Sequence, residues 1–263
     1  MTDFEDSEKE FKAPWKAWAD KYKDSPRATF RDQIQFEMEV KAIYDSISKK
    51  GERVLDLGCG NGASFSMLLK LGLKPSAISG GDALDKFINI ARKKIPHGDF
   101  FIMNLTSKDS ICWEKIKDFR PTVVILKRVL CNLSGRKSQR LALARVCRCL
   151  PKSCKIIIIE PMQEGLQRLN ILRYLFGLEA LKEPMFNEYL RWEDIHYCLK
   201  KSSCINITKV DYSSTYYIGS RILQPFFWPD VEPDYNHPIN KYFSKLPYRE
   251  GFGLHWIIRA KKS

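Results

Sequence analysis

The chain has 263 residues, of which 44% are hydrophobic, and its formal net charge is +13 at pH 7. This length and composition allow one large α/β domain with a sizeable core, and they exclude disorder as the expected state. The sequence has no run of about 18 apolar residues and its N-terminus is acidic, so we expect a cytoplasmic protein with neither a membrane insertion nor a secretory signal.

The excess of Lys and Arg is spread along the chain in short runs. A basic protein often binds a phosphate-rich partner, but these runs do not alternate with aromatic residues as a nucleic-acid stacking platform would. Nucleic acid is therefore a less favoured partner than a small molecule. Cys147, Cys149 and Cys154 lie close together in sequence but lack the paired spacing and the nearby histidine of a zinc site, so we expect no bound metal.

The first expected element is an amphipathic helix over residues 9–24. Its aromatic residues recur at spacings of four, three and four, and they are Phe11, Trp15, Trp18 and Tyr22. Such a stripe is usually a packing face, but a helix that precedes the main fold can also act as a lid over a site. We therefore predict an N-terminal helical lid over residues 1–34 and a main domain over residues 35–263.

Strands and helices then alternate. A helix is expected from Arg31 to Lys49, with Gly51 as its C-terminal stop. The strands predicted next are residues 54–57, 77–79, 100–103, 122–126 and 156–159, with helices at residues 63–71, 83–94 and 139–150. This alternation predicts a mostly parallel sheet with helices on both faces.

The pattern changes after the fifth strand. Residues 161–203 are mostly helical in pattern and longer than a crossover needs, so we predict a helical cap insertion there. Residues 205–219 are expected to form a strand and its continuation, residues 224–250 an ordered loop, and residues 255–258 the last strand. The predicted fold is a seven-stranded, mostly parallel, Rossmann-like α/β sheet.

Three glycines, Gly58, Gly60 and Gly62, connect the first strand to its helix. Glycine lets the backbone approach a ligand closely, and the helix N-terminus offers free N–H groups to a carboxylate or phosphate. Asp82 follows Gly62 by twenty residues, at the end of the second strand, where a carboxylate can accept hydrogen bonds from ribose hydroxyls. The G-x-G-x-G spacing differs from the dinucleotide fingerprint, which disfavours a nicotinamide-dependent oxidoreductase.

Residues 54–62 (Val-Leu-Asp-Leu-Gly-Cys-Gly-Asn-Gly) resemble the first motif of class I methyltransferases that use S-adenosylmethionine (SAM). Residues 79–83 resemble the family's second-strand acid motif, residues 119–125 its fourth-strand motif, and residues 145–154 its helix-to-strand hinge. The resemblance covers roughly residues 35–160 and the final strand. Asn104 replaces the usual third-strand Asp, Gly81 replaces a bulkier residue, and the hinge lacks its Gly-Gly pair.

This resemblance implies a SAM site at the ends of the first strands. The glycines and Asp56 would surround the methionine part, Asp82 the ribose, and Asn104 with Leu105 the adenine, while an N-terminal arm could reach the SAM carboxylate. The implied cofactor-binding residues are Asp56, Gly58, Cys59, Gly60, Asn61, Gly62, Asp82, Ala83, Asn104, Leu105, Lys127 and Arg31.

Methyl transfer to oxygen benefits from a general base. The fourth strand is followed by Lys-Arg-Val-Leu rather than by the Asn/Asp-Pro-Pro-Tyr/Phe signature of base methylation, so we expect metal-free O-methylation. The catalytic candidates are His237, Glu160 and Arg128, although a lone loop histidine is more often structural. The candidates for acceptor binding are Asn170, Arg173, Asn187 and Tyr189, and a solvated helix face is the alternative for the first two.

Residues 164–173 and 187–190 are similar to a cap segment of bacterial methyltransferases that serve capsule or surface-sugar pathways. This similarity suggests a small, phosphorylated or sugar-like acceptor. An RNA methyltransferase and a non-catalytic SAM-binding partner subunit remain as alternative functions. Steep salt dependence of RNA binding would distinguish the first of them.

Overall fold

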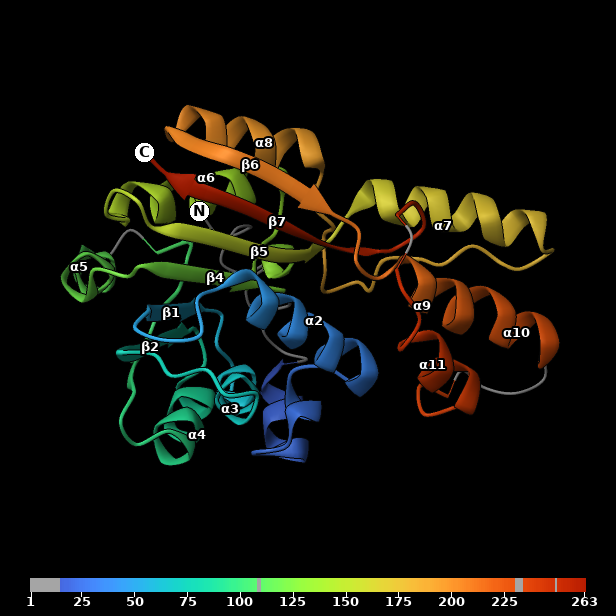
Figure 1. Ribbon diagram of the computed structural model, residues 1–263, viewed down its shortest axis with the longest axis horizontal. Coiled ribbons are helices and arrows are strands. Elements are labelled where there is room, and N and C mark those ends of the chain that lie inside the picture. The colour runs from blue at the N-terminus through green and yellow to red at the C-terminus, as the bar shows by residue number, and fades with distance from the viewer. Residues whose placement is uncertain (1–14, 108–109, 230–233, 249) are drawn as a thin grey trace, which may run out of the picture.

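A mixed β-sheet forms the centre of the protein (Figure 1). The structure is a computed structural model that describes residues 15–107, 110–229, 234–248 and 250–263. The strands lie in the order β3-β2-β1-β4-β5-β7-β6. In chain order they are β1 (Arg53–Leu57), β2 (Ala77–Asp82), β3 (Asp99–Ile102), β4 (Val123–Lys127), β5 (Lys155–Pro161), β6 (Cys204–Val210) and β7 (His255–Lys262).

The strands β1 to β5 are parallel, and β7 is antiparallel to both of its neighbours, β5 and β6. This arrangement confirms the predicted seven-stranded, mostly parallel α/β sheet. The strand order reverses between β1 and β4, because the chain moves outward through β2 and β3 before it returns to β4. Ligands of open α/β sheets bind at this kind of switch point, beyond the carboxyl ends of the strands.

Helices cover both faces of the sheet (Figure 1). One face packs against α2 (Gln33–Ser46), α3 (Ala63–Lys70) and α4 (Asp85–Lys94). The other face packs against α5 (Ser110–Phe119), α6 (Arg136–Cys149) and α8 (Trp192–Lys201). Side chains alternate along a strand, so Val54 of β1 joins the first core and Leu55 joins the second.

A cap of helices extends beyond the carboxyl ends of the parallel strands (Figure 1). The cap has its own core, which includes Leu169, Tyr189, Tyr216 and Ile222. It is assembled from two insertions, one after β5 and one between β6 and β7. Its helices are α7 (Gln163–Leu175), α9 (Ser214–Ile218), the π-helical turn η3 (Gly219–Leu223), α10 (Gln224–Phe227) and α11 (Pro238–Phe243).

The second insertion differs from its prediction. The expected strand continuation over residues 215–218 is wrong, because this segment forms α9, and the expected loop over residues 224–250 contains α10 and α11. Thr, Tyr and Ile favour strands. Tyr216 is nevertheless fully buried in the cap core, and its hydroxyl donates to the Asp32 carboxylate at 2.8 Å. Tertiary packing therefore overrides local preference here.

Three smaller predictions also need correction. Helix α8 was predicted within the cap, but Ile195 and Leu199 pack it into the core of the sheet. Helix α5 was not predicted, although the buried residues Trp113 and Ile116 have helical spacing. Helix α2 ends at Ser46, and Gly51 lies instead in the turn before β1 with a φ of +78°.

The described part of the predicted N-terminal lid is helical over residues 15–22. The rings of Trp15 and Trp18 are 5.1 Å apart, and both contact Phe186 of the cap at 6.0 and 5.8 Å. A short 3-10 helix, η1 (Pro26–Ala28), follows before α2. Phe11 lies outside the described residues, and the boundary between lid and main domain stays a prediction.

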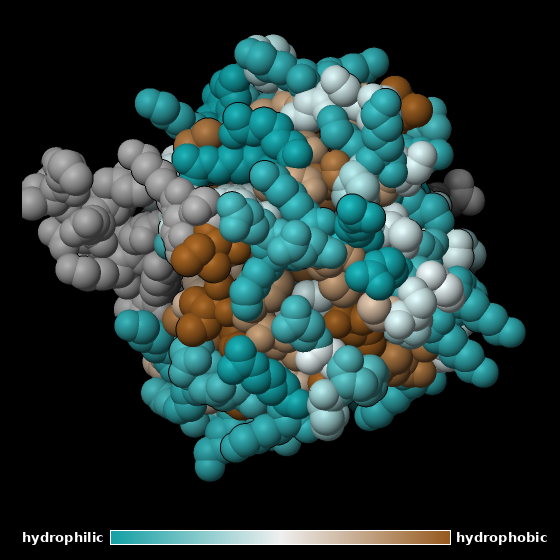
Figure 2. Space-filling model, turned by 90° about the vertical axis from the view of Figure 1, so that its left-hand side faces the viewer, coloured by the Kyte–Doolittle hydropathy of each residue, from teal (hydrophilic) through white to brown (hydrophobic). Residues whose placement is uncertain are grey.

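Figure 2 shows the side of the molecule that lies away from α7 and α10. Hydrophilic residues cover most of this face, and hydrophobic residues show in separate groups between them. None of the helices in the described part of the chain combines the length and the apolarity that a membrane span requires.

Candidate functional site

The turn between β1 and α3 depends on glycine. Gly58, Gly60 and Gly62 have φ values of +84°, +52° and +75°, a region that other residues rarely adopt. Space is restricted as well, because a Cβ atom on Gly58 would lie 2.5 Å from Val129 and one on Gly60 would lie 2.6 Å from Thr29. The turn therefore keeps its shape only with glycine at these positions.

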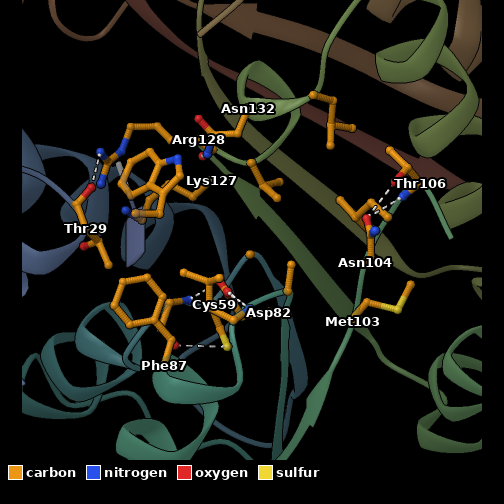
Figure 3. A pocket seen from close by; sticks show the side chains of 18 of the residues that line it. Thr29, Cys59, Asp82, Phe87, Met103, Asn104, Thr106, Lys127, Arg128 and Asn132 are labelled. Atoms are coloured by element: carbon orange, nitrogen blue, oxygen red, sulfur yellow. Dashed lines mark hydrogen bonds between the residues drawn. The ribbon is translucent and has the colours of Figure 1, made fainter. Parts of the chain in front are cut away.

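A cavity lies beside this turn, at the carboxyl ends of β1, β2 and β4 (Figure 3). It holds about 1120 Å³ of empty space, part of it open to solvent. We call it the first cavity. The predicted cofactor-binding residues that line it are Gly58, Cys59, Gly60, Asp82, Ala83, Asn104, Leu105 and Lys127.

Asp82 connects the glycine turn to the end of β2 (Figure 3). Its Oδ2 atom accepts a hydrogen bond from the Gly60 N–H at 2.9 Å, and its Oδ1 atom accepts one from the Leu84 N–H at 2.9 Å. Burial raises the pKa of Asp82, and the backbone N–H groups oppose that shift. Each carboxylate oxygen has a further lone pair, so Asp82 can also accept hydrogen bonds from two ligand hydroxyls.

Asp56 lies behind the turn and does not line the first cavity. Its side chain is buried, and its Oδ1 atom has no hydrogen-bond partner within the described chain. Burial raises the pKa of Asp56 to about 7; Asp82 adds to this shift and Lys127 opposes it. A buried carboxyl group in this state would be stabilised in its ionised form by a nearby ligand cation.

Three other predicted cofactor-binding residues lie away from this cavity. Asn61 donates through Nδ2 to the backbone oxygens of Lys23 and Ser25, at 3.0 and 2.9 Å, and so holds the N-terminal segment against the turn. Gly62 is the N-cap of α3, and a Cβ atom there would lie 3.3 Å from Ala91 Cβ. Arg31 lies over the Trp18 ring at 5.0 Å and lines a different cavity.

A buried charge cluster lies at the end of β4. Glu39 of α2 accepts hydrogen bonds through Oε2 from Lys127 Nζ at 3.2 Å and from Arg128 Nε at 3.1 Å. Burial raises the pKa of Glu39, but Arg128 and Lys127 outweigh burial, so this pKa lies below its usual value. Burial lowers the pKa of Lys127 to about 8, and Arg128 adds to that effect. The cluster therefore anchors two cations beside the first cavity.

A second cavity adjoins the first, between the sheet and the cap. It holds about 1050 Å³ of empty space, again partly open to solvent. Trp15, Arg128 and Asn132 line both cavities, so the two spaces are neighbours. Among the predicted acceptor-binding residues, Asn187 and Tyr189 line this second cavity.

The remaining predicted acceptor-binding residues and the predicted base lie outside the walls of both cavities. The Nδ2 atom of Asn170 donates to the Leu181 backbone oxygen at 2.9 Å, and its Oδ1 atom accepts from the Leu181 N–H at 2.8 Å. Arg173 donates to the backbone oxygens of Glu179 and Arg221. His237 accepts from the Ile239 N–H at 3.3 Å and so caps α11. None of these three residues lines either cavity. Each makes hydrogen bonds within the cap instead.

Glu160, a predicted catalytic residue, lies where its side chain can position the backbone after β4. It is fully buried at the end of β5, where it accepts hydrogen bonds from the N–H groups of Val129, Leu130 and Cys131 at 2.8, 2.8 and 3.3 Å. These residues include the start of the short helix η2 (Leu130–Asn132). Glu160 thus holds the segment that separates the two cavities.

Removal of this carboxylate should destabilise the protein. Glu160→Ala leaves two buried N–H groups and one partly buried N–H group without an acceptor, and we expect the free energy of unfolding to fall by about 3 kcal/mol or more, measured by urea denaturation. Glu37→Ala, an exposed change on α2, is the matched control and should cost less than about 0.5 kcal/mol. Wild-type stability for Glu160→Ala would contradict the positioning role.

Two residues of the second cavity were not among the site residues predicted from the sequence. Tyr217 and His255 are both buried, both line this cavity, and the Tyr217 hydroxyl lies 2.8 Å from His255 Nδ1. His255 begins β7, where it pairs with Pro161 at the end of β5. A histidine that opens an antiparallel strand next to a parallel one lies at the edge where sheet ligands bind, and this is the signal that could have identified it.

No protein-family model and no curated protein matches the chain. Several solved structures are similar to the chain. A SAM-dependent methyltransferase from Thermotoga maritima, described as a possible histamine N-methyltransferase, has a TM-score of 0.59 and 14% identity, with 96% of this chain and 100% of that chain covered. Magnesium protoporphyrin IX methyltransferase from Synechocystis PCC 6803 has a TM-score of 0.55 and 14% identity, with coverages of 95% and 93%. The cyclase SpnF has a TM-score of 0.53 and 15% identity, with coverages of 86% and 81%.

The chain has the class I methyltransferase fold. The likeness extends over nearly the whole chain and includes the antiparallel hairpin of β6 and β7 at the edge of the sheet. The first cavity lies at the switch point of this fold. None of the three similar proteins is described as a capsule or surface-sugar enzyme.

Proposed function

We propose that this protein transfers a methyl group from SAM to an oxygen atom of a small, anionic acceptor. The observation that supports the proposal is that two cavities with different linings share part of their walls. The first combines a glycine turn with a carboxylate at the switch point of the sheet. The second, which shares Trp15, Arg128 and Asn132 with the first, is lined by aromatic rings and cations.

The residues of the first cavity fit SAM. Gly58 and Gly60 present backbone without side chains, and Asp82 offers two oxygens for ribose hydroxyls. Asn104 and Leu105 line the wall expected to face adenine. The buried Asp56 supplies negative charge behind the turn for the ammonium group. A bound SAH in the similar Synechocystis enzyme supports the same ligand class here.

SAM supplies a methyl group on a sulfonium that is already reactive, so this chain needs chiefly to align the acceptor and exclude water. Arg128 is placed for alignment, because it lines both cavities while Glu39 and the Thr29 backbone oxygen hold its guanidinium. Trp15 borders both cavities and, with Trp18 and Phe186, covers the junction from the lid and the cap.

Calorimetry with SAM and S-adenosylhomocysteine (SAH) tests the cofactor half of this proposal. Asp82→Asn keeps the shape of the side chain but removes its charge, and we expect SAH affinity to fall by about 1–3 kcal/mol. Asp85→Asn, an exposed change three residues along the chain, is the control and should bind SAH as wild type does. Equal affinity of both variants and the wild type would place the ligand elsewhere.

Labelled SAM and a screen of small acceptors test the transfer half. Methyl transfer to small anionic molecules supports the proposal. Transfer only to RNA, with steep loss of RNA binding as salt is added, would contradict it. Transfer only after addition of a second protein would identify the chain as a SAM-binding partner subunit instead.

A further inference from the structure

The second cavity has more cationic than anionic side chains in its wall. Arg221 is paired with Asp32 at 2.9 Å, and Arg128 is paired with Glu39 at 3.1 Å. Two further cations, Arg31 and Lys182, line the same cavity and are exposed to solvent. Neither forms an ion pair with any other residue that the structure describes. These two cations are therefore available to an acid group on the acceptor.

Aromatic rings form much of the remaining wall. The rings of Trp15, Trp18 and Phe186 meet edge to face at 5.1 to 6.0 Å. The amides of the wall are already engaged, because Asn187 Nδ2 donates to Asn132 Oδ1 at 2.6 Å and Asn132 Nδ2 donates to the Arg128 backbone oxygen at 2.8 Å. A sugar would bury many hydroxyls that each need a partner. The wall suits a flat ring better.

A chain of three buried side chains ends at this cavity. The Tyr217 hydroxyl lies 2.8 Å from His255 Nδ1, and His255 Nε2 lies 3.9 Å from Glu39 Oε1. That oxygen has no hydrogen-bond partner within the described chain. Burial lowers the pKa of His255 to about 4; Glu39 opposes this shift, and Arg128 and Lys127 add to it. The imidazole is therefore neutral at pH 7, a weak base whose unprotonated nitrogen can receive a proton transiently.

This chain of side chains lies near the junction of the two cavities. The Phe30 ring is 5.9 Å from the His255 ring, and the Arg128 guanidinium lies over the same Phe30 ring at 3.7 Å. Arg128 lines both cavities. An acceptor hydroxyl at Tyr217 would therefore be linked through His255 and Phe30 to Arg128, which borders the first cavity.

We propose that the second cavity binds a flat, hydroxylated aromatic carboxylic acid, with its acid group at Arg31 and Lys182 and its hydroxyl at Tyr217 beside His255. This inference rests on the proposed methyltransferase function and names its acceptor class. Arg31 and Lys182 favour an acid group on the acceptor, and the aromatic rings of the wall favour a flat ring. The neutral imidazole of His255 can receive the proton of the acceptor hydroxyl by way of Tyr217.

The acceptor oxygen forms the new O–CH3 bond, while the S–CH3 bond of SAM breaks and leaves its electron pair on sulfur. The acceptor proton passes to the Tyr217 oxygen as the Tyr217 proton passes to His255 Nδ1. The imidazolium so formed turns its Nε2–H toward Glu39 and later returns the proton to solvent. The products are a methyl ether and SAH.

Binding to the SAH-saturated protein tests the acceptor class. The probes are 3-hydroxybenzoate and 4-hydroxycinnamate as hydroxylated aromatic acids, phenol as the probe without an acid group, and glucose 6-phosphate as a sugar phosphate. Tryptophan fluorescence can follow binding, since Trp15 and Trp18 line the cavity, and calorimetry provides the Kd. We expect at least one acid to bind ten-fold or more tightly than both phenol and glucose 6-phosphate.

Charge variants test the position of the acid group. In the double variant Arg31→Gln, Lys182→Gln, the Kd of the tightest acid should rise about ten-fold or more, whereas the Kd of phenol should change less than two-fold. The control double variant Lys74→Gln, Lys117→Gln removes two exposed cations outside both cavities and should leave both constants unchanged.

Tyr217→Phe tests the proton path. Turnover of the tightest acid with labelled SAM should slow about 100-fold, the scale of lost acid–base assistance, while its Kd rises no more than about ten-fold, the scale of one lost hydrogen bond. The labelled product should be an ether. A methyl ester as product, a sugar phosphate that binds more tightly than both acids, or no acid binding to protein that does bind SAH would each overturn the proposal. Failure of SAH itself to bind would instead overturn the methyltransferase function on which it rests.

Discussion

Gly60→Val is expected to abolish measurable binding of SAM and SAH while the protein stays folded. Gly60 has a φ of +52°, and a Cβ atom there would lie 2.6 Å from Thr29 Cγ2. The valine side chain would also enter the wall of the first cavity, where the turn passes closest to the expected ligand. We expect the Kd, measured by calorimetry, to rise at least 100-fold.

The matched control for this experiment is Gly51→Val. Gly51 has a similar left-handed conformation, with a φ of +78°, but a Cβ atom there would have no neighbour within 4 Å, and Gly51 does not line the first cavity. Both variants therefore carry a similar backbone strain, of about 1–2 kcal/mol. If Gly60→Val binds SAH as well as Gly51→Val does, the glycine turn is not the ligand site.

Glu39→Gln should produce the largest loss of stability among single conservative substitutions in the site. Glu39 is fully buried and accepts hydrogen bonds from Lys127 and Arg128. Its replacement leaves these two buried cations without a counter-charge, which typically costs about 3–5 kcal/mol. Urea denaturation at pH 7 measures the change. Asp45→Asn, which breaks an exposed ion pair with Lys41 on the same helix, should cost less than about 1 kcal/mol.

The stability contribution of Glu39 should also depend on pH. The pKa of Glu39 in the folded protein lies below its ordinary value of 4.5. Its contribution is therefore fully present above about pH 4.5 and is lost as the pH falls through the folded-state pKa. The difference in unfolding free energy between wild type and Glu39→Gln should shrink as the pH is lowered from about 6 toward about 3. A constant difference across that range would contradict the ion cluster as its cause.

Much of the first cavity was predictable from the sequence because its residues are local. Gly58 and Gly60 follow one strand directly, and Asp82 ends the next strand. Parallel neighbouring strands end at one edge, so residues at their carboxyl ends must meet there. The contacts of Asn61 could not be predicted in this way. Its place in the motif predicted a cofactor contact, but its amide binds the backbone of the N-terminal segment.

The second cavity was beyond such reasoning, because distant segments build it. Tyr217 and His255 are 38 residues apart, and Glu39 belongs to a helix that precedes the sheet. His237 has the loop context expected of a base, yet its ring caps a short helix of the cap. The types and sequence spacings of these residues do not indicate which of their side chains will face one another in the fold.

The parallel sheet, its glycine turn and the carboxylate beside it could all be predicted from short stretches of sequence, because strand periodicity and turn chemistry act over a few residues. Three other features follow from the packing of distant segments: which histidine faces a cavity, which cations stay without an ion pair among the described residues, and the helical form of residues 214–218. Those outcomes depend on burial and on long-range packing, where the free energy of excluding side chains from water outweighs the local preferences of the backbone.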